Sequence, residues 1–180
     1  MHSVEILFTE FVTHNVKRFI VEKPEGYSFT PGQATDVAVD QPDWQDRTRP
    51  FTFTSLNEDK VIEFTIKEYP DHNGVTQKLH SLTPGDSILV GDPWGTIQFK
   101  GSGVFIAGGA GITPFIAIFR DQFLKAALDN SSLIFANHHS KDVILEKELR
   151  EIFPSDHLHL ILTRESGTRD HKEYEQAYID

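Results

Sequence analysis

Two rhythms of apolar and polar residues divide the chain. From Val4 to about Phe99, short runs rich in β-branched and aromatic residues alternate with turn residues, which predicts strands joined by tight turns. Such spacing is typical of a small antiparallel barrel. One short helix is expected at Val75–Leu82. The expected strands are Val4–Val12, Val16–Glu22, Thr35–Val39, Phe51–Ser55, Val61–Lys67 and Ser87–Gly91.

From Gly103 onward the pattern changes to strands alternating with helices. This alternation predicts right-handed βαβ units on a parallel sheet. The fold class is therefore an antiparallel β-barrel followed by an α/β parallel-sheet domain, with Lys100–Ser102 between them, giving residues 1–100 and 101–180. The expected elements of the second domain are strands Val104–Ala107, Leu133–Ala136 and Leu158–Thr163, and helices Pro114–Leu128 and Asp142–Phe153.

The corner between the first of these strands and its helix is rich in glycine. Gly108, Gly109 and Gly111 precede Thr113, the expected N-cap, and Pro114, the expected first helical residue. Such a corner directs backbone N–H groups and the positive end of the helix dipole outward, and small residues let a phosphate approach. A tight turn without a ligand is the alternative interpretation.

Three motifs together resemble those of the ferredoxin–NADP reductase superfamily, in its flavodoxin reductase-like form. Residues 49–55 read Arg-Pro-Phe-Thr-Phe-Thr-Ser, residues 74–76 read Gly-Val-Thr, and residues 108–114 read Gly-Gly-Ala-Gly-Ile-Thr-Pro. The family carries Arg-x-Tyr-Ser/Thr-x-x-Ser, Gly-x-Ser/Thr and Gly-Gly-x-Gly-Ile-Thr-Pro in the same order. The resemblance implies an FAD-binding barrel over residues 1–100 and an NAD(P)-binding domain over residues 101–180.

On the flavin side, the resemblance implies that the segment Arg49, Pro50, Phe51 and Thr52 binds FAD. Arg49 would hold a phosphate through its planar fork, and Thr52 would lie near flavin N5 as the candidate catalytic residue. Phe51 stands where the family has Tyr; a plain core role is the alternative for it, as a surface arginine is for Arg49. The other implied FAD contacts are Ile66, Lys67, Gly74, Val75 and Thr76, although Gly74–Thr76 also fits a simple helix start.

On the nucleotide side, the resemblance implies that Gly109, Ala110, Gly111 and Thr113 receive the pyrophosphate of NAD(P)H. Cofactor choice depends on residues after the second and third strands. Asn137 follows the second strand without an acidic neighbour, and Arg164 follows the third. NADP(H) is therefore the expected cofactor, with NAD(H) possible. No metal site is expected, because His138 and His139 are adjacent and their side chains would point apart.

The end of the chain departs from the family. Residues 164–180 are mostly polar and do not continue the βα rhythm, so only three parallel strands are evident and the domain is expected to be truncated. The family continues to a Cys-Gly-Pro-like segment, and this chain has no cysteine. Either the sequence is shortened or the protein has lost part of the domain.

Composition narrows the remaining classes. The chain of 180 residues contains no run of about 20 apolar residues, which predicts no membrane span, and its first residues lack a signal-peptide pattern, which predicts a cytoplasmic protein. A net charge of −10 disfavours nucleic acid as a partner. The absence of cysteine excludes a cysteine-ligated iron–sulfur cluster, so electrons would leave to a separate carrier.

The resulting hypothesis is an FAD-dependent NAD(P)H oxidoreductase that passes electrons to a carrier protein such as flavodoxin or ferredoxin. Because such carriers are acidic, docking would need a local basic patch, for which Arg47, Arg49, Lys67 and Lys78 are the candidates. The alternative function is a non-catalytic flavin-binding module with a vestigial nucleotide domain.

Overall fold

The computed structural model describes residues 1–69, 74–164 and 174–176. It divides into two compact units. One comprises Met1–Phe99 and Thr113–Ile118, and the other comprises Lys100–Ile112 and Phe119–Asp180. Among the described residues, no helix is long and apolar enough to span a bilayer.

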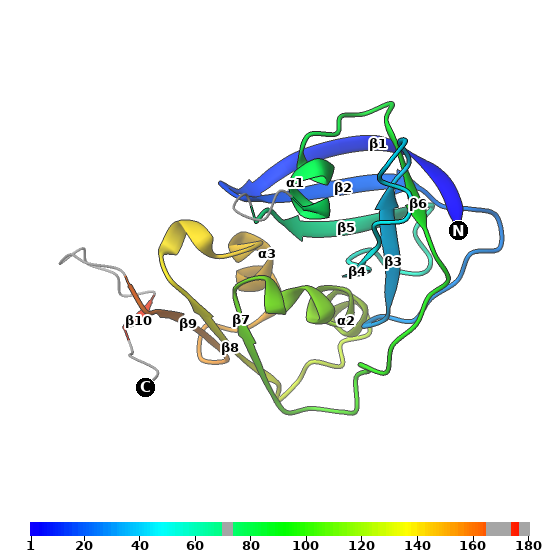
Figure 1. Cartoon of the computed structure of the whole chain (residues 1–180). Helices are drawn as coiled ribbons and strands as arrows, with labels where there is room; N and C mark the ends of the chain where they lie inside the picture. The colour runs from blue at the N-terminus through cyan, green and yellow to red at the C-terminus, as the bar shows by residue number, and fades with distance from the viewer. Residues whose placement is uncertain (70–73, 165–173, 177–180) are drawn as a thin grey trace. The chain divides into compact units, whose positions relative to one another are not determined.

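The first unit is built on six antiparallel strands (Figure 1). In the sheet they run in the order β4-β3-β6-β1-β2-β5, and each strand pairs with its neighbours in antiparallel orientation. The expected strands at residues 16–22 and 61–67 are found with those same bounds. The strands are β1 (His2–Thr13), β2 (Val16–Glu22), β3 (Ala34–Val39), β4 (Arg49–Thr52), β5 (Val61–Lys67) and β6 (Ser87–Val90).

The sheet closes on itself just after β4. Residues 49–52 pair with β3, and the next residue, Phe53, forms a bridge with Phe64 of β5, which is the strand at the other edge. The expected single strand Phe51–Ser55 is therefore shifted, because the segment changes partner at Phe53. This closure confirms the predicted antiparallel barrel.

Aromatic and aliphatic side chains fill the barrel. Phe53 is fully buried, stacks on Phe29 with ring centroids 4.1 Å apart, and lies 5.6 Å from the ring of Phe64. Helix α1 (Val75–His80) joins this core through Val75 and Leu79, so the short helix between β5 and β6 is fixed by packing. Its expected end at Leu82 is two residues beyond the observed one.

The second unit carries a parallel sheet in the order β10-β9-β8-β7 (Figure 1). The three expected strands are present, and the structure adds a two-residue fourth strand, β10. The elements are β7 (Val104–Gly108), a 3₁₀ turn η2 (Gly109–Ile112), α2 (Thr113–Leu124), β8 (Ser132–Asn137), a 3₁₀ turn η3 (Ser140–Asp142), α3 (Glu146–Ile152), β9 (Leu158–Leu162) and β10 (Glu175–Gln176).

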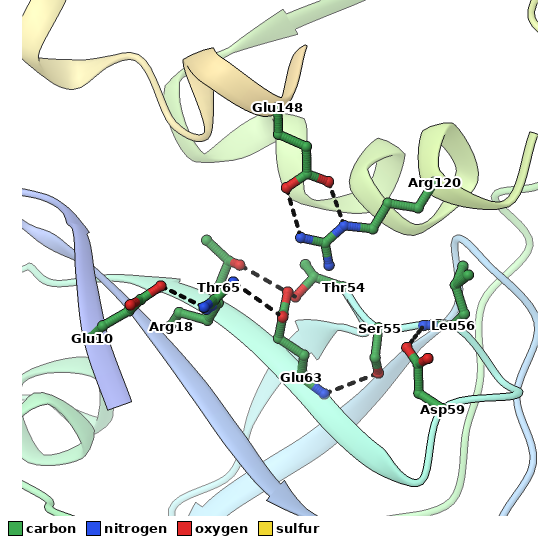
Figure 2. Close-up of polar contacts among 10 residues, drawn as sticks. All are labelled: Glu10, Arg18, Thr54, Ser55, Leu56, Asp59, Glu63, Thr65, Arg120 and Glu148. Atoms are coloured by element: carbon green, nitrogen blue, oxygen red, sulfur yellow. Dashed lines mark hydrogen bonds and ion pairs between the residues drawn. The ribbon is translucent and has the colours of Figure 1, made fainter. Parts of the chain in front are cut away.

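The two faces of this sheet differ in burial. Leu133, Phe135 and Leu160 on one face are buried, and the Phe119 ring of α2 packs edge-to-face on Phe105 and Phe153. On the other face of β7, the side chains of Val104 and Ile106 are 63% and 70% exposed. Helices α2 and α3 are joined by a bidentate ion pair in which the Arg120 guanidinium donates to both Glu148 oxygens, at 2.5 and 2.9 Å (Figure 2).

Helix α3 is shorter than the periodicity predicts. The expected helix Asp142–Phe153 is broken because Val143 and Ile144 are both buried and Val143 is extended, with ψ of 107°. Leu145 then adopts a left-handed conformation with φ of 53°, and the helix starts at Glu146. Consecutive β-branched residues favour extended backbone over helix, and here both enter the core.

Candidate functional site

The flavin motif begins at the exposed strand β4. Arg49 and Pro50 are exposed, whereas Phe51 and Thr52 are half-buried. The Arg49 guanidinium donates to its neighbour Thr48 through the carbonyl oxygen at 2.7 Å and makes no ion pair with a described residue. Its fork is therefore available to an external anion. Phe51 packs partly against the barrel core, which supports the core role considered for it.

A buried polar cluster holds the segment that follows β4, and the sequence analysis did not anticipate it (Figure 2). The Thr54 hydroxyl donates to Glu63 Oε1 at 2.8 Å and lies 3.2 Å from the Thr65 hydroxyl. The Ser55 hydroxyl accepts the Glu63 N–H at 2.9 Å, and the Thr54 N–H donates to the Glu63 carbonyl at 2.8 Å. These bonds fix the segment that follows β4 against β5.

Arg18 completes this cluster. Its guanidinium lies 2.5 Å from Glu10 and 3.7 Å from Glu63, which is 8% exposed (Figure 2). A buried carboxylate needs hydrogen bonds and a cation, and Glu63 has both. The signal in the sequence was a charged residue, Glu63, at an interior position of the strand Val61–Lys67. The motif's last serine therefore has a structural partner in this chain.

Helix α1 presents a start suited to an anion. Gly74 is its N-cap with extended backbone and no side-chain cap, and the first turn contains no acidic residue. Val75 is buried in the core, so it could reach a ligand only through its backbone N–H, whereas Thr76 is half-buried. At the other end, the Lys17 ammonium donates to the carbonyls of His80 and Leu82, at 3.2 and 2.7 Å. Burial lowers the pKa of Lys17, with Asp86 opposing the shift.

Ile66 and Lys67 lie at the end of β5. The Ile66 side chain is 1% exposed and belongs to the barrel core, and its carbonyl oxygen accepts a hydrogen bond from His80 Nε2 at 2.8 Å. Any contact from Ile66 to a cofactor would therefore involve backbone atoms. Lys67 is half-buried, with its ammonium 6.0 Å from the Tyr69 ring centroid.

Two of the candidate docking cations meet on one aromatic ring. The Arg47 guanidinium lies 4.8 Å from the Trp44 ring centroid, and the Lys78 ammonium lies 5.9 Å from it. These distances are within the range of cation–π attraction. Both cations were expected from the sequence, but Trp44 was not. Because Lys78 belongs to α1, the shared contact with Trp44 places the loop before β4 beside that helix.

The glycine corner of the second unit differs from the expected cap. The 3₁₀ turn Gly109–Ile112 leads directly into α2, so Ile112 precedes the helix with helical backbone and Thr113 is its first residue. The prediction of Thr113 as N-cap was wrong, because Ile112 is the N-cap and already has helical backbone. Gly109 has φ of 49°, which favours glycine.

Gly111 has another reason to be small. Its φ is not positive, and a Cβ built there would meet no atom within 4 Å. Neither the fold nor the backbone conformation requires glycine at this position. The missing side chain leaves open space at the start of a helix, as close approach of a phosphate requires.

Asn137 lies beside this corner at the carboxyl end of β8. Gly108 pairs with Ala136, and Asn137 pairs with Leu162 of β9. The Asn137 side chain is 5% exposed, yet neither its Oδ1 nor its Nδ2 has a hydrogen-bond partner among the described residues. A buried amide without partners is costly, so its donors and acceptor are suited to a ligand.

The residues after β8 and β9 converge at the same edge. The Thr163 N–H donates to the Asn137 carbonyl and the Arg164 N–H donates to the His138 carbonyl, both at 2.9 Å. The Arg164 side chain is exposed. The structure thus brings Gly109, Ala110, Gly111, Asn137 and Arg164 to the carboxyl edge of a parallel sheet, where open α/β sheets bind ligands.

Known families match both parts of the chain. The oxidoreductase FAD-binding domain matches residues 3–99, and the oxidoreductase NAD-binding domain matches residues 105–180. The chain belongs to the oxidoreductase FAD-binding domain family. It combines this FAD-binding domain with an NAD-binding domain, and the uncapped helix start at Gly74 and the open glycine corner fit the phosphates of the two cofactors.

Several relatives of this family are reductases. The chain is 30% identical over 185 residues to human NADH-cytochrome b5 reductase 1, covering 84% of this chain and 60% of the relative. It is 24% identical over 156 residues to the ferredoxin–NAD(P)(+) reductase component of the naphthalene 1,2-dioxygenase system of Pseudomonas putida, covering 84% and 46%. The chain thus spans about half the length of the curated relatives it matches.

Solved structures confirm the fold. The flavohem-like FAD/NAD-binding domain of nitric oxide dioxygenase from Vibrio cholerae superposes with a TM-score of 0.83 at 16% identity, covering 99% of this chain and 79% of that chain. A ferredoxin–NADP⁺ reductase from Neisseria gonorrhoeae with bound FAD and NADP gives a TM-score of 0.76 at 20% identity, covering 97% and 72%. The expected ferredoxin–NADP reductase-like fold is therefore confirmed.

Proposed function

We propose that this chain is a flavin-dependent reductase that takes a hydride from NAD(P)H and passes electrons to a separate carrier protein. In this proposal residues 1–100 bind FAD and residues 101–180 bind the nucleotide. The flavin, when bound, accepts a hydride and releases electrons singly. The protein's own residues bind, orient and shield the two cofactors.

On the flavin side, Arg49 and the start of α1 hold the pyrophosphate of FAD. Arg49 supplies a charge-assisted contact, and Gly74, Val75 and Thr76 supply backbone N–H groups and one hydroxyl. Thr52 holds its hydroxyl or N–H near flavin N5, with Pro50 and Phe51 beside it. Ile66 contributes backbone atoms and Lys67 its ammonium along the flavin edge.

On the nucleotide side, the glycine corner receives the pyrophosphate of NAD(P)H. Gly109, Ala110 and Gly111 let the phosphates reach the helix start, with Thr113 next to them. Asn137 offers its buried amide, which is the observation that carries this assignment. Arg164 offers the exposed cation that would favour the 2′-phosphate of NADP(H) over NAD(H).

For the carrier, an acidic one-electron protein such as flavodoxin or ferredoxin fits best. This chain has a net charge of −10, so an acidic partner needs a local group of cations. The pair Arg47 and Lys78 on Trp44 provides one in the FAD-binding domain, near Arg49 in sequence. The names of the relatives include both ferredoxin and cytochrome b5 reductases, and the choice between carriers is part of the proposal.

The deciding experiment follows flavin reduction in single turnover under anaerobic conditions, comparing wild type with Gly111→Val. Because a side chain at position 111 meets open space, the fold should be unchanged while the pyrophosphate is blocked. Reduction by NADPH should slow at least about tenfold, or ~1.4 kcal/mol, whereas dithionite should still reduce the bound flavin.

Gly103→Val is the matched control. Position 103 precedes the other end of β7, has no positive φ and also meets nothing within 4 Å, so reduction should proceed at the wild-type rate. If Gly111→Val is also reduced at that rate, the reductase assignment fails and the flavin-binding module takes its place. Arg164→Ala sharpens cofactor choice, since it should slow reduction by NADPH and leave reduction by NADH nearly unchanged.

A further inference from the structure

A pocket of about 590 Å³ lies at the amino edge of the parallel sheet. It is bounded by the loop that joins α2 to β8 and by the loop that joins α3 to β9. Phe123, Leu128, Ile152 and Pro154 provide an apolar lining, and Asp129, Ser131 and His157 provide polar groups. Its volume is in the range of small-molecule sites, which are mostly apolar with a few polar groups.

The α2–β8 loop bends twice to form one wall. Ala126 and Asn130 have positive φ of 50° and 61°, conformations that are unfavourable for alanine and tolerated by asparagine. Directly after Asn130, the Ser131 N–H donates back to the Leu128 carbonyl at 2.9 Å. These contacts hold Ser131 at the start of β8.

The Ser131 hydroxyl is the unsatisfied group of this pocket. Ser131 is 1% exposed, and its Oγ has no hydrogen-bond partner among the described residues. Its backbone groups are both used, since its carbonyl also accepts a hydrogen bond from His157 Nδ1 at 3.0 Å. A buried hydroxyl without a partner is costly to retain, so its presence in a pocket wall points to a ligand.

His157 adds a ring that can both donate and accept hydrogen bonds. Its Nδ1 lies 3.0 Å from both the Ser131 carbonyl oxygen and the Ser132 hydroxyl, and its Nε2 lies 3.9 Å from an Asp156 carboxylate oxygen. None of the described residues that line the pocket is a lysine or arginine, and Asp129 adds a carboxylate. An anion would find no counter-charge here. An uncharged ligand with an apolar ring and a hydroxyl could both donate and accept.

We propose that this pocket binds a small uncharged aromatic alcohol or phenol. The assignment is independent of the proposed reductase function. Ser131 directly precedes strand β8 and Asn137 is the last residue of that strand, so six residues at about 3.3 Å each place the pocket ~20 Å from the nucleotide edge. The ligand therefore binds without competing with NAD(P)H.

The test titrates phenol into the ¹⁵N-labelled full chain and follows amide shifts by NMR. Saturable shifts are expected at Ser131, Ser132 and His157, with no such shifts from benzoate, which has the same ring and a negative charge. Excess NADPH should leave the phenol affinity unchanged. Absence of saturable shifts with phenol, equal binding of benzoate, or displacement by NADPH would each overturn the proposal.

Substitution of Ser131 tests the hydroxyl directly. Ser131→Ala should weaken phenol binding about threefold to tenfold, as expected for one neutral hydrogen bond. Because the hydroxyl has no partner within the described chain, its removal should not harm the fold. Ser155→Ala makes the same change at an exposed position of the α3–β9 loop and should bind as wild type. Equal affinity in Ser131→Ala and wild type would reject the role of the hydroxyl and the site as proposed.

Discussion

The barrel and the parallel sheet bury their strands in different ways. In the barrel, strand β5 has five consecutive buried residues, from Ile62 to Ile66, and the Phe53–Phe64 bridge joins its outer edge to the segment after β4. In the parallel sheet, strand β7 lies at an edge, with Ile106 70% exposed on one face and Ala107 6% exposed on the other. Parallel sheets are ordinarily covered on both faces.

This difference assigns different tasks to the two units. A closed barrel with an aromatic core is stabilised by its own side chains, so residues on its surface are available for binding. The parallel sheet is stabilised by α2 and α3 on one face, and its binding residues cluster at the carboxyl edge. In the barrel, substitutions of surface residues should therefore change cofactor affinity without changing stability. In the parallel sheet, substitutions on the buried face should lower stability more than substitutions on the exposed face.

The largest expected effect is a loss of stability on substitution in the barrel core. Phe53→Ala removes a ring that is fully buried and stacked on Phe29, and should lower the free energy of unfolding by about 3–5 kcal/mol. Urea unfolding followed by near-ultraviolet circular dichroism measures it. Phe11→Ala, at a ring 61% exposed on β1, is the matched control and should cost about 1 kcal/mol or less. A similar cost at both positions would contradict the closed core.

The next effect concerns binding without loss of fold. Arg49→Ala should weaken FAD binding by about 1.5–3 kcal/mol, or ~10- to 150-fold, because one charge-assisted phosphate contact is lost. Its stability should be unchanged, since Arg49 is exposed and bonds only its neighbour's carbonyl. Flavin fluorescence titration gives the affinity, and chromatography of the released cofactor distinguishes FAD from FMN.

Arg47→Ala removes the same charge two residues away and serves as the control for Arg49. It should change FAD affinity less than about threefold, because its guanidinium stacks on Trp44. If Arg49→Ala retains FAD as tightly as wild type, Arg49 is a surface arginine and the barrel anchors its cofactor elsewhere.

Features of the fold and of the candidate sites that depend on neighbouring residues were predictable from the sequence, whereas those that depend on contacts distant in sequence were not. The strands at 16–22 and 61–67 follow from local patterning, and the glycine corner follows from a short motif. The change of partner at Phe53, the break at Leu145 and the cluster around Glu63 depend on contacts distant in sequence. Asn137 was predicted as a nucleotide residue, but only the fold reveals that its amide is buried without a partner. Tertiary contacts override local propensity at such positions.

A smaller effect concerns the buried histidine of α1. Burial lowers the pKa of His80 below its ordinary value of 6.5, although its hydrogen bond to Ile66 and the charge of Glu68 oppose the shift and Lys17 adds to it. Above pH 6.5 the imidazole is neutral in both states. As pH falls through 6.5, the unfolded chain binds the proton first, so the free energy of unfolding should decrease toward the lower folded pKa.

Urea unfolding between pH 7.5 and 5 measures this slope, and the comparison with His80→Gln isolates the histidine from the carboxylates. The variant should lose stability less steeply as pH falls. His14→Gln makes the same change at an exposed position and should keep the wild-type slope. An unchanged slope in His80→Gln would mean that burial of this ring does not oppose its protonation.

The smallest expected effect tests the open face of the sheet. Ile106→Thr keeps β-branching on strand β7 and changes a side chain that is 70% exposed, so local stability should change by about 0.5 kcal/mol or less. Ile62→Thr makes the same change at a fully buried position of β5 and should cost more than about 2 kcal/mol, because it loses apolar contacts and buries a hydroxyl. Hydrogen exchange of the amides in β8 and β2 reports the two units separately. Because the substitution is the same and the two isoleucines differ most in exposure, an equally large cost at Ile106 would mean that its face is covered in solution, and the contrast between the barrel and the sheet would then disappear.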